Sequence, residues 1–104
     1  MTVSTSRSAY NDCYDLFDRA AAPGSIGIRV SCETRGMANN LRTRLHYARK
    51  LNRELAKEMF EPDHPDHGKS VYDPLVVRVH SDGDGWWVYI EPRVVQGEVE
   101  ELRA

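Results

Sequence analysis

Apolar and polar residues recur with two different periods along this chain of 104 residues. Between residues 8 and 22, apolar side chains lie three or four positions apart, which is the spacing of one face of an α-helix. These side chains are Tyr10, Cys13, Tyr14, Phe17 and Ala21. Pro23 and Gly24 follow and end the predicted helix. Residues 26–32 alternate instead and predict a half-buried strand, with Ile26, Ile28, Val30 and Cys32 on its apolar face.

A second and longer helix is predicted over roughly residues 36–60. Thr34 is the best candidate for its N-cap, because a hydroxyl there can accept a free backbone N–H. Pro62 marks its end. Leu51 is expected on the flank of the apolar stripe, which is formed by Met37, Leu41, Leu45, Ala48, Leu55 and Met59.

A polar connection, residues 61–74, leads to two apolar segments separated by the sequence SDGDG, which is typical of a β-hairpin. The connection is long for a compact domain and is therefore expected to be mobile or functional. We prefer a hairpin loop over residues 81–84, because a five-residue loop would mix the two faces. In the preferred register one face carries Leu75, Val77, Val79, Trp86, Val88 and Ile90.

The order α-β-α-β-β predicts an α+β fold in two layers, with a three-stranded sheet and the long basic helix on one face. A right-handed crossover makes the first strand parallel to the second, either adjacent to it or separated from it by the third. The N-terminal helix, or a second copy in a homodimer, is expected to cover the opposite face. Residues 1–104 are interpreted as a single domain, with residues 1–7 and about 96–104 flexible.

We expect this protein to be cytoplasmic. The first residues contain no apolar run after a positive segment, so we expect no signal peptide. We also expect no association with a membrane, because no stretch reaches the roughly 18 apolar residues of a spanning helix. Cys13 and Cys32 show no CxxC spacing. A disulfide between them is one alternative, but we favour buried thiols in a reducing compartment.

Charge is distributed unevenly in a chain whose net charge is −2. Residues 35–57 contain seven basic residues and one acidic residue, Glu54, so this segment carries +6 and the remainder −8. Four of these basic side chains and one histidine fall within about 80° of one another around the axis of the long helix, and we call this surface the basic face. The basic face consists of Arg42, His46, Arg49, Arg53 and Lys57.

The basic face has the arginine-rich character that suits successive phosphates. Together with Arg35 in the turn before the helix, it predicts a small non-enzymatic accessory protein that binds DNA or RNA. The alternatives are an interaction module or inhibitor that docks on an acidic protein surface, and a solvated face with no partner. Since Arg42 and Arg49 both lie off the apolar stripe, replacing both by glutamate is expected to remove partner binding and leave the fold intact.

The outer face of the predicted sheet is a second candidate surface. It carries Arg29, Arg78, Trp87 and Tyr89, with Ser31, Val76 and His80. Arg78 is expected opposite Trp87, where the two could form a cation–π pair. Such a face can stack unpaired bases. The alternative, which the apolar stripe of the first helix favours, is that Tyr14 and Phe17 cover Trp87 and Tyr89.

Other segments offer little chemistry. Asp63, His64, Asp66 and His67, with His80, include metal-ligand types, but the proline-containing loop lacks the spacing of a closed site. The turn 33–36 could hold an anion at a helix N-terminus but lacks a phosphate-loop pattern. No cysteine, serine or histidine stands in a nucleophile motif, and paired carboxylates occur only in the loop and the tail. We therefore expect no enzyme activity, no cofactor and no metal.

Overall fold

The computed structural model describes residues 9–93. Its elements follow the predicted order, with α2 (Asn11–Ala21), β1 (Ile28–Cys32), α3 (Arg35–Met59), β2 (Leu75–Ser81) and β3 (Trp86–Pro92). The predicted α+β fold is confirmed. The termini expected to be flexible, residues 1–7 and about 96–104, both lie outside the described residues, as do the acidic residues Glu98, Glu100 and Glu101. No helix in the described part is long and apolar enough to cross a membrane.

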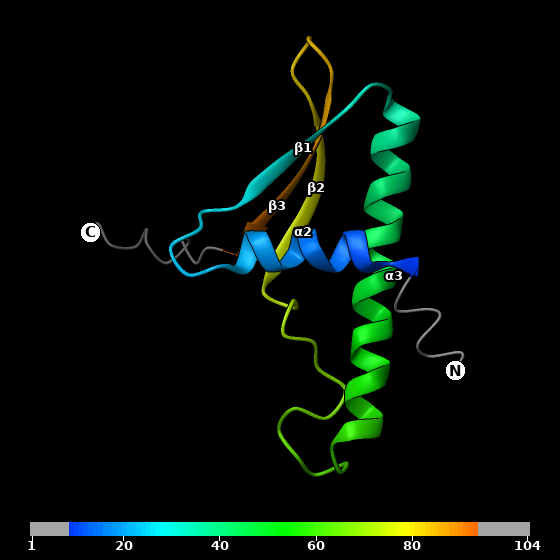
Figure 1. Cartoon of the computed structure of the whole chain (residues 1–104), viewed down its shortest axis with the longest axis vertical. Helices are drawn as coiled ribbons and strands as arrows, with labels where there is room; N and C mark the ends of the chain where they lie inside the picture. The colour runs from blue at the N-terminus through cyan, green and yellow to red at the C-terminus, as the bar shows by residue number, and fades with distance from the viewer. Residues whose placement is uncertain (1–8, 94–104) are drawn as a thin grey trace, which may run out of the picture.

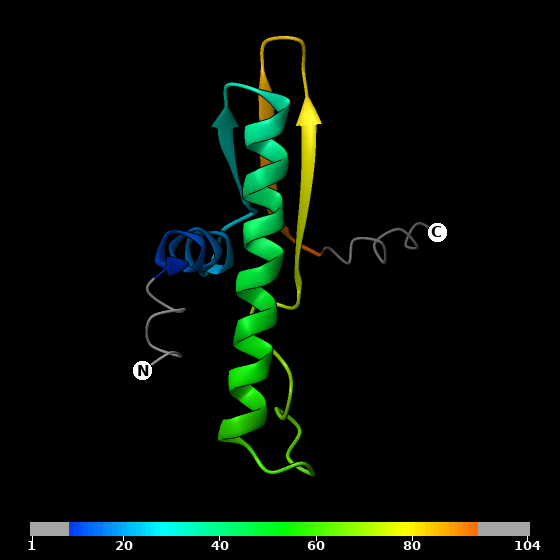
Figure 2. The same ribbon diagram turned by 90° about the vertical axis from the view of Figure 1, so that its right-hand side faces the viewer.

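The three strands form one sheet in the order β1-β3-β2 (Figure 1). Both outer strands run antiparallel to β3. Strands β1 and β2 are therefore parallel, as the crossover rule predicts. Of the two orders that the sequence left open, the structure has the one with β3 between them. Figure 2 shows α3 lying in front of the sheet, with β1 and β2 on either side of it.

The hairpin loop lies one residue later than predicted. Ser81 pairs with Trp86, which leaves Asp82–Gly85 as the loop. The carboxylate of Asp82 accepts the backbone N–H of Asp84 at 3.0 Å, and Gly83 adopts a positive φ of 92°. Moving the loop by one residue shifts the partner of each β2 residue by two positions along β3. Because side chains alternate with a period of two, every side chain stays on its predicted face. Arg78 consequently lies opposite Tyr89, and its predicted position opposite Trp87 is wrong.

Strand β1 begins two residues later than expected. Gly27 has a φ of 118°, a value that breaks the alternation of side chains before Ile28. A Cβ at Gly27 would lie 2.9 Å from the carbonyl oxygen of Ile90, so the close approach of the two chains also requires glycine. Ile26 is 90% exposed, and its expected place on the apolar face is wrong.

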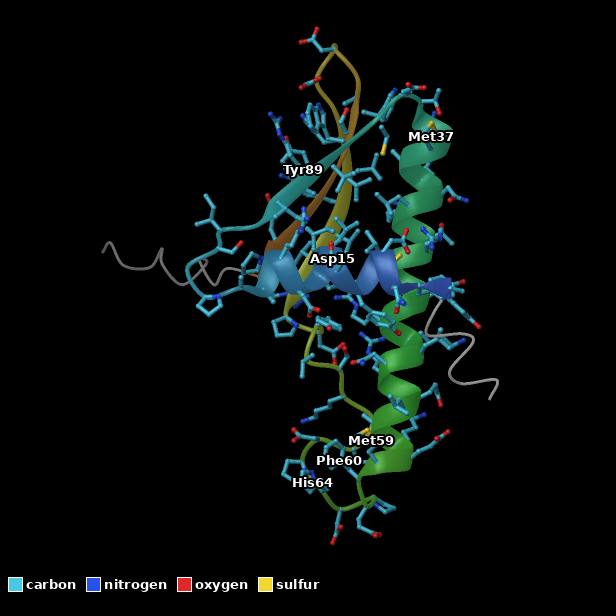
Figure 3. All side chains as sticks on the ribbon, in the orientation of Figure 1. Asp15, Met37, Met59, Phe60, His64 and Tyr89 are labelled. Carbon is cyan, nitrogen blue, oxygen red and sulfur yellow. The ribbon has the colours of Figure 1, made fainter. Side chains whose placement is uncertain are left out.

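Helix α3 agrees with the predicted range within one residue, and Thr34 caps it by accepting the N–H of Met37 at 3.1 Å. The buried side of α3 is rotated about the helix axis relative to the predicted apolar stripe, so that it includes Arg49 of the basic face. Met37 and Met59, at the two ends of the helix, are 51% and 65% exposed (Figure 3). The buried residues are Ala38, Leu45, Ala48, Arg49 and Ala56.

Helix α2 packs on the same side of the sheet as α3. Cys13 and Phe17 of α2 belong to one buried cluster with Leu45 of α3 and with Val88 and Ile90 of β3. Figure 1 shows α2 running across from α3 towards the sheet. The hydroxyl of Tyr14 donates to the carbonyl oxygen of Ala48 at 2.9 Å and ties the two helices together. The prediction that α2 covers the outer face of the sheet is therefore wrong.

Candidate functional site

Arg49 of the basic face points into the protein. It is 8% exposed. Its guanidinium donates to the carbonyl oxygens of Tyr72 at 2.9 Å and Leu75 at 2.6 Å, and it lies 5.7 Å from the ring centroid of Phe17. Arg49 thus joins α3 to the start of β2, and the prediction that it belongs to the exposed surface is wrong.

Two further members of the basic face are paired with carboxylates. Arg53 binds Asp73 at 2.7 Å, and Lys57 lies 3.5 Å from Glu54. Burial alone would raise the pKa of Asp73, but the backbone N–H of Ser70 and the guanidinium of Arg53 outweigh it and lower that pKa. Asp73 therefore stays ionised at neutral pH and offsets part of the positive charge.

Arg35, Arg42 and His46 keep exposed side chains on α3. Within residues 9–93, neither arginine forms an ion pair, although the guanidinium of Arg35 lies 5.9 Å from the ring centroid of Trp86. The pKa of His46 is lowered, first by burial and then by the charges of Arg49, Arg42 and Arg53. The potential around His46 is therefore positive despite the ion pairs nearby.

Arg44, which lies outside the predicted basic face, connects α3 to α2. It holds both carboxylate oxygens of Asp12, at 2.7 Å and 2.9 Å, and donates to the carbonyl oxygen of Ala9. This bidentate bond is the main reason that the pKa of Asp12 is lowered. The carboxylate of Asp12 on α2 therefore offsets the charge of Arg44 on α3.

The outer face of the sheet, which we call the open face, brings four predicted residues together. The guanidinium of Arg29 lies 3.8 Å from the ring centroid of Trp87, and that of Arg78 lies 4.2 Å from the ring centroid of Tyr89. Arg29 also donates to the hydroxyl of Tyr89 at 3.4 Å. Figure 3 shows Tyr89 on the side of the sheet away from α3. Each aromatic ring of the open face is thus stacked with an arginine.

Other side chains hold these rings in place. The indole N–H of Trp87 donates to Asp82 at 3.0 Å, and the ring of His80 meets that of Tyr89 edge-on at 5.9 Å. The pKa of Asp82 is lowered, chiefly by the backbone N–H of Asp84, so the carboxylate stays ionised. Sequence reasoning missed Asp82, although its position five residues before Trp87 across a tight hairpin could have indicated the contact.

Charge on the open face is only partly balanced. Arg78 pairs with Glu91 at 3.3 Å. Arg29 forms no ion pair within residues 9–93, but its charge contributes to the lowered pKa of Asp82. A shallow hollow borders the face and is lined by Ile26, Gly27, Ile28, Arg29, Tyr89 and Glu91. Arginine side chains and half-buried aromatic rings therefore occur together, beside a hollow, on the sheet face that neither described helix covers.

The connection 61–74 is folded against the end of α3. His64 stacks on Phe60 at 4.5 Å, as Figure 3 shows, and Nδ1 of His67 donates to the carbonyl oxygen of Phe60 at 2.9 Å. Ser70 donates to the side chain of Asn52 at 2.6 Å. Among the described residues, no three or more His, Cys, Asp or Glu side chains are grouped to hold a metal ion. The contacts indicate a structural connection.

Both cysteines are expected to be unreactive in the folded protein. Cys13 and Cys32 are free and buried, and burial raises the pKa of Cys13 to about 11 from 9.0. At pH 8 this lowers its thiolate fraction about a hundredfold. We therefore expect a thiol-reactive disulfide reagent to label neither residue in buffer and both in urea. Rapid labelling of the folded protein would contradict the burial of these side chains.

Comparison of the chain with protein-family models, with curated proteins and with solved structures finds no match in any of the three. The proposals below therefore depend on the geometry of the chain itself.

Proposed function

We propose that this chain is a small non-enzymatic nucleic-acid-binding protein, and that unpaired bases bind its open face. One observation carries the proposal. Both helices pack on the opposite side of the sheet, while Arg29 with Trp87 and Arg78 with Tyr89 remain on a face that no described helix covers. An open aromatic face of this kind normally has a ligand, because a bare one favours association.

The chemistry of the open face suits a single strand better than a duplex. Bases that are not paired present flat π-surfaces, which stack on aromatic rings and on guanidinium planes. Stacking on a ring leaves the guanidinium of Arg29 without an ion pair among the described residues, although the charge of Asp82 acts on it from a distance. Phosphate is the group that such a guanidinium binds well. Contacts of this type tolerate any base, so we expect little sequence preference.

The exposed residues of α3 support the same function as secondary contacts. Arg35 and Arg42 carry positive charge without an ion-pair partner in the described part of the chain, and they can attract phosphates over a distance set by salt. The free thiols Cys13 and Cys32 are compatible with the cytoplasm, where thiols stay reduced. The competing function, docking on an acidic protein, uses the same charges but gives the open aromatic face no part.

Replacing Trp87 by alanine is expected to weaken the binding of a fluorescent ten-nucleotide oligothymidine by about 1–3 kcal/mol, because one stacking platform is lost. Fluorescence anisotropy at two salt concentrations measures this change. Tyr47→Ala is the matched control, since Tyr47 is 44% exposed but lies on α3. It should change affinity little.

A Trp86→Phe background makes Trp87 the only tryptophan of the chain. In this background, single-stranded oligonucleotide should quench Trp87 fluorescence, and duplex of the same sequence should quench it far less. Equal affinity for single strand and duplex would contradict binding of unpaired bases by the open face. Equal losses of oligonucleotide affinity in Trp87→Ala and Tyr47→Ala would contradict it as well. Absence of oligonucleotide binding, with capture of one acidic protein that resists nuclease, would favour the competing function.

A further inference from the structure

A second cluster of donors surrounds His46 on α3. Arg42 and Arg53 lie four residues before and seven residues after His46, so all three share one side of the helix. Arg49 lies beneath them, with its NH2 group 3.5 Å from Nδ1 of His46. The cluster is on the side of the sheet opposite to the open face, because it belongs to α3.

The charge of Arg49 is hydrogen-bonded but not neutralised. Its two backbone acceptors, the carbonyl oxygens of Tyr72 and Leu75, satisfy donors and supply no negative charge. The charge of Asp73, on the segment before β2, acts on Arg49, but Arg53 already binds this carboxylate at 2.7 Å. Around His46 three guanidinium groups therefore face one carboxylate.

The contact with Arg49 determines the tautomer of His46. A guanidinium can only donate, so Nδ1 of His46 must accept and carries no proton in the neutral ring. The proton then resides on Nε2. Because His46 is exposed, its Nε2–H is a donor that solvent or a ligand can reach. The cluster thus presents the donors of Arg42 and His46 to solvent. The charge of Arg49, which has no carboxylate of its own, lies beneath them.

We propose that Arg42 and the Nε2–H of His46 bind a phosphate group above the buried charge of Arg49. Phosphate is the ligand class that fits, because its oxygens accept from several donors and its charge offsets the excess positive charge. The phosphate can be free or part of a nucleic-acid backbone. In the second case this site would add a contact to the proposed function, but it does not rest on that function.

The test follows the C2–H proton resonance of His46 by NMR during pH titration. Inorganic phosphate is expected to raise the pKa of His46 relative to sodium chloride of equal ionic strength, since an anion favours the charged imidazolium. The effect should saturate with phosphate concentration. Equal pKa values in phosphate and chloride would overturn the proposal.

Two charge-matched variants separate a site from general screening. Arg42→Gln should weaken phosphate binding about tenfold or more, because it removes a charge-assisted donor. Arg19→Gln removes the same charge from an exposed position on α2 and should have almost no effect. Equal losses in the two variants would overturn the proposal as well.

An abasic deoxyribose–phosphate oligomer distinguishes the two sources of the ligand. It has a backbone and no bases, so it cannot stack on the open face. Competition with inorganic phosphate at His46 supports a backbone ligand, whereas a response to inorganic phosphate alone supports a free one. The Trp87→Ala variant should behave like the wild type in this assay, and so failure of the open-face proposal would leave the result unchanged.

Discussion

Replacing Phe17 by alanine is expected to lower the free energy of unfolding by about 3–5 kcal/mol, which is the usual cost of removing a buried phenyl group. Phe17 has no exposed surface and stacks on Tyr72 with 4.8 Å between ring centroids. Since small domains are stable by only about 5–15 kcal/mol, the variant should lose much of its stability. Urea unfolding followed by circular dichroism measures the change.

The same variant tests the position of α2. If α2 packs beside α3, the cavity opens on the helix side of the sheet, and the environment of Trp87 stays as it is. In the Trp86→Phe background, the emission maximum of Trp87 should therefore be the same with and without Phe17→Ala under folding conditions. A clear shift of this maximum would place α2 on the open face. Tyr47→Ala, which removes an exposed aromatic ring, should cost less than about 1 kcal/mol.

Replacing Arg49 by leucine is expected to destabilise the fold by about 2–4 kcal/mol. The substitution keeps apolar volume but removes the guanidinium donor from the carbonyl oxygens of Tyr72 and Leu75. The oxygen of Tyr72 still accepts the backbone N–H of Leu75 at 3.0 Å, so the cost falls mainly on the oxygen of Leu75, and a buried acceptor that loses its donor costs about 1–3 kcal/mol. The loss is reduced because an uncompensated buried charge is also removed. Thermal and urea unfolding would both detect a change of this size.

Arg42→Leu is the control for this experiment, because Arg42 lies on the same helix with an exposed side chain and no ion pair in the described residues. Its effect should stay within about 0.5 kcal/mol. If Arg49→Leu were equally mild, the bonds from α3 to the start of β2 would not contribute to stability. The contrast also revises the double glutamate variant, since Arg49→Glu would place a carboxylate against two carbonyl oxygens and disrupt the fold.

The two proposed surfaces lie on opposite sides of the sheet. The open face combines stacking with charge, whereas the cluster around His46 contains no tryptophan, tyrosine or phenylalanine. The first therefore suits unpaired bases and the second suits phosphate alone. Separate variants, Trp87→Ala and Arg42→Gln, make the two contributions measurable one at a time.

The sequence by itself determined the elements, the faces of the hairpin and the relative direction of the first two strands. The helical spacing of residues 10–21, the N-cap at Thr34 and the turn residues around Gly83 act over a few positions, so the pattern contains all the information that they need. The handedness of the crossover then makes β1 parallel to β2, but it leaves open whether β3 lies between them, and only the structure gives the order β1-β3-β2. The inward and outward faces of the hairpin also follow from alternation alone.

Only the tertiary structure decided which side α2 packs on and which arginine is buried. An amphipathic helix must bury its apolar side, but its periodicity does not identify the surface that it packs against. The position of Phe17 in the sequence is therefore compatible with packing on either side of the sheet. Arg49 is buried because the chain returning into β2 presents two backbone carbonyl oxygens there. A contact between residues more than twenty positions apart leaves no trace in local spacing, so an arginine that supports the fold and one that faces solvent look the same in the sequence.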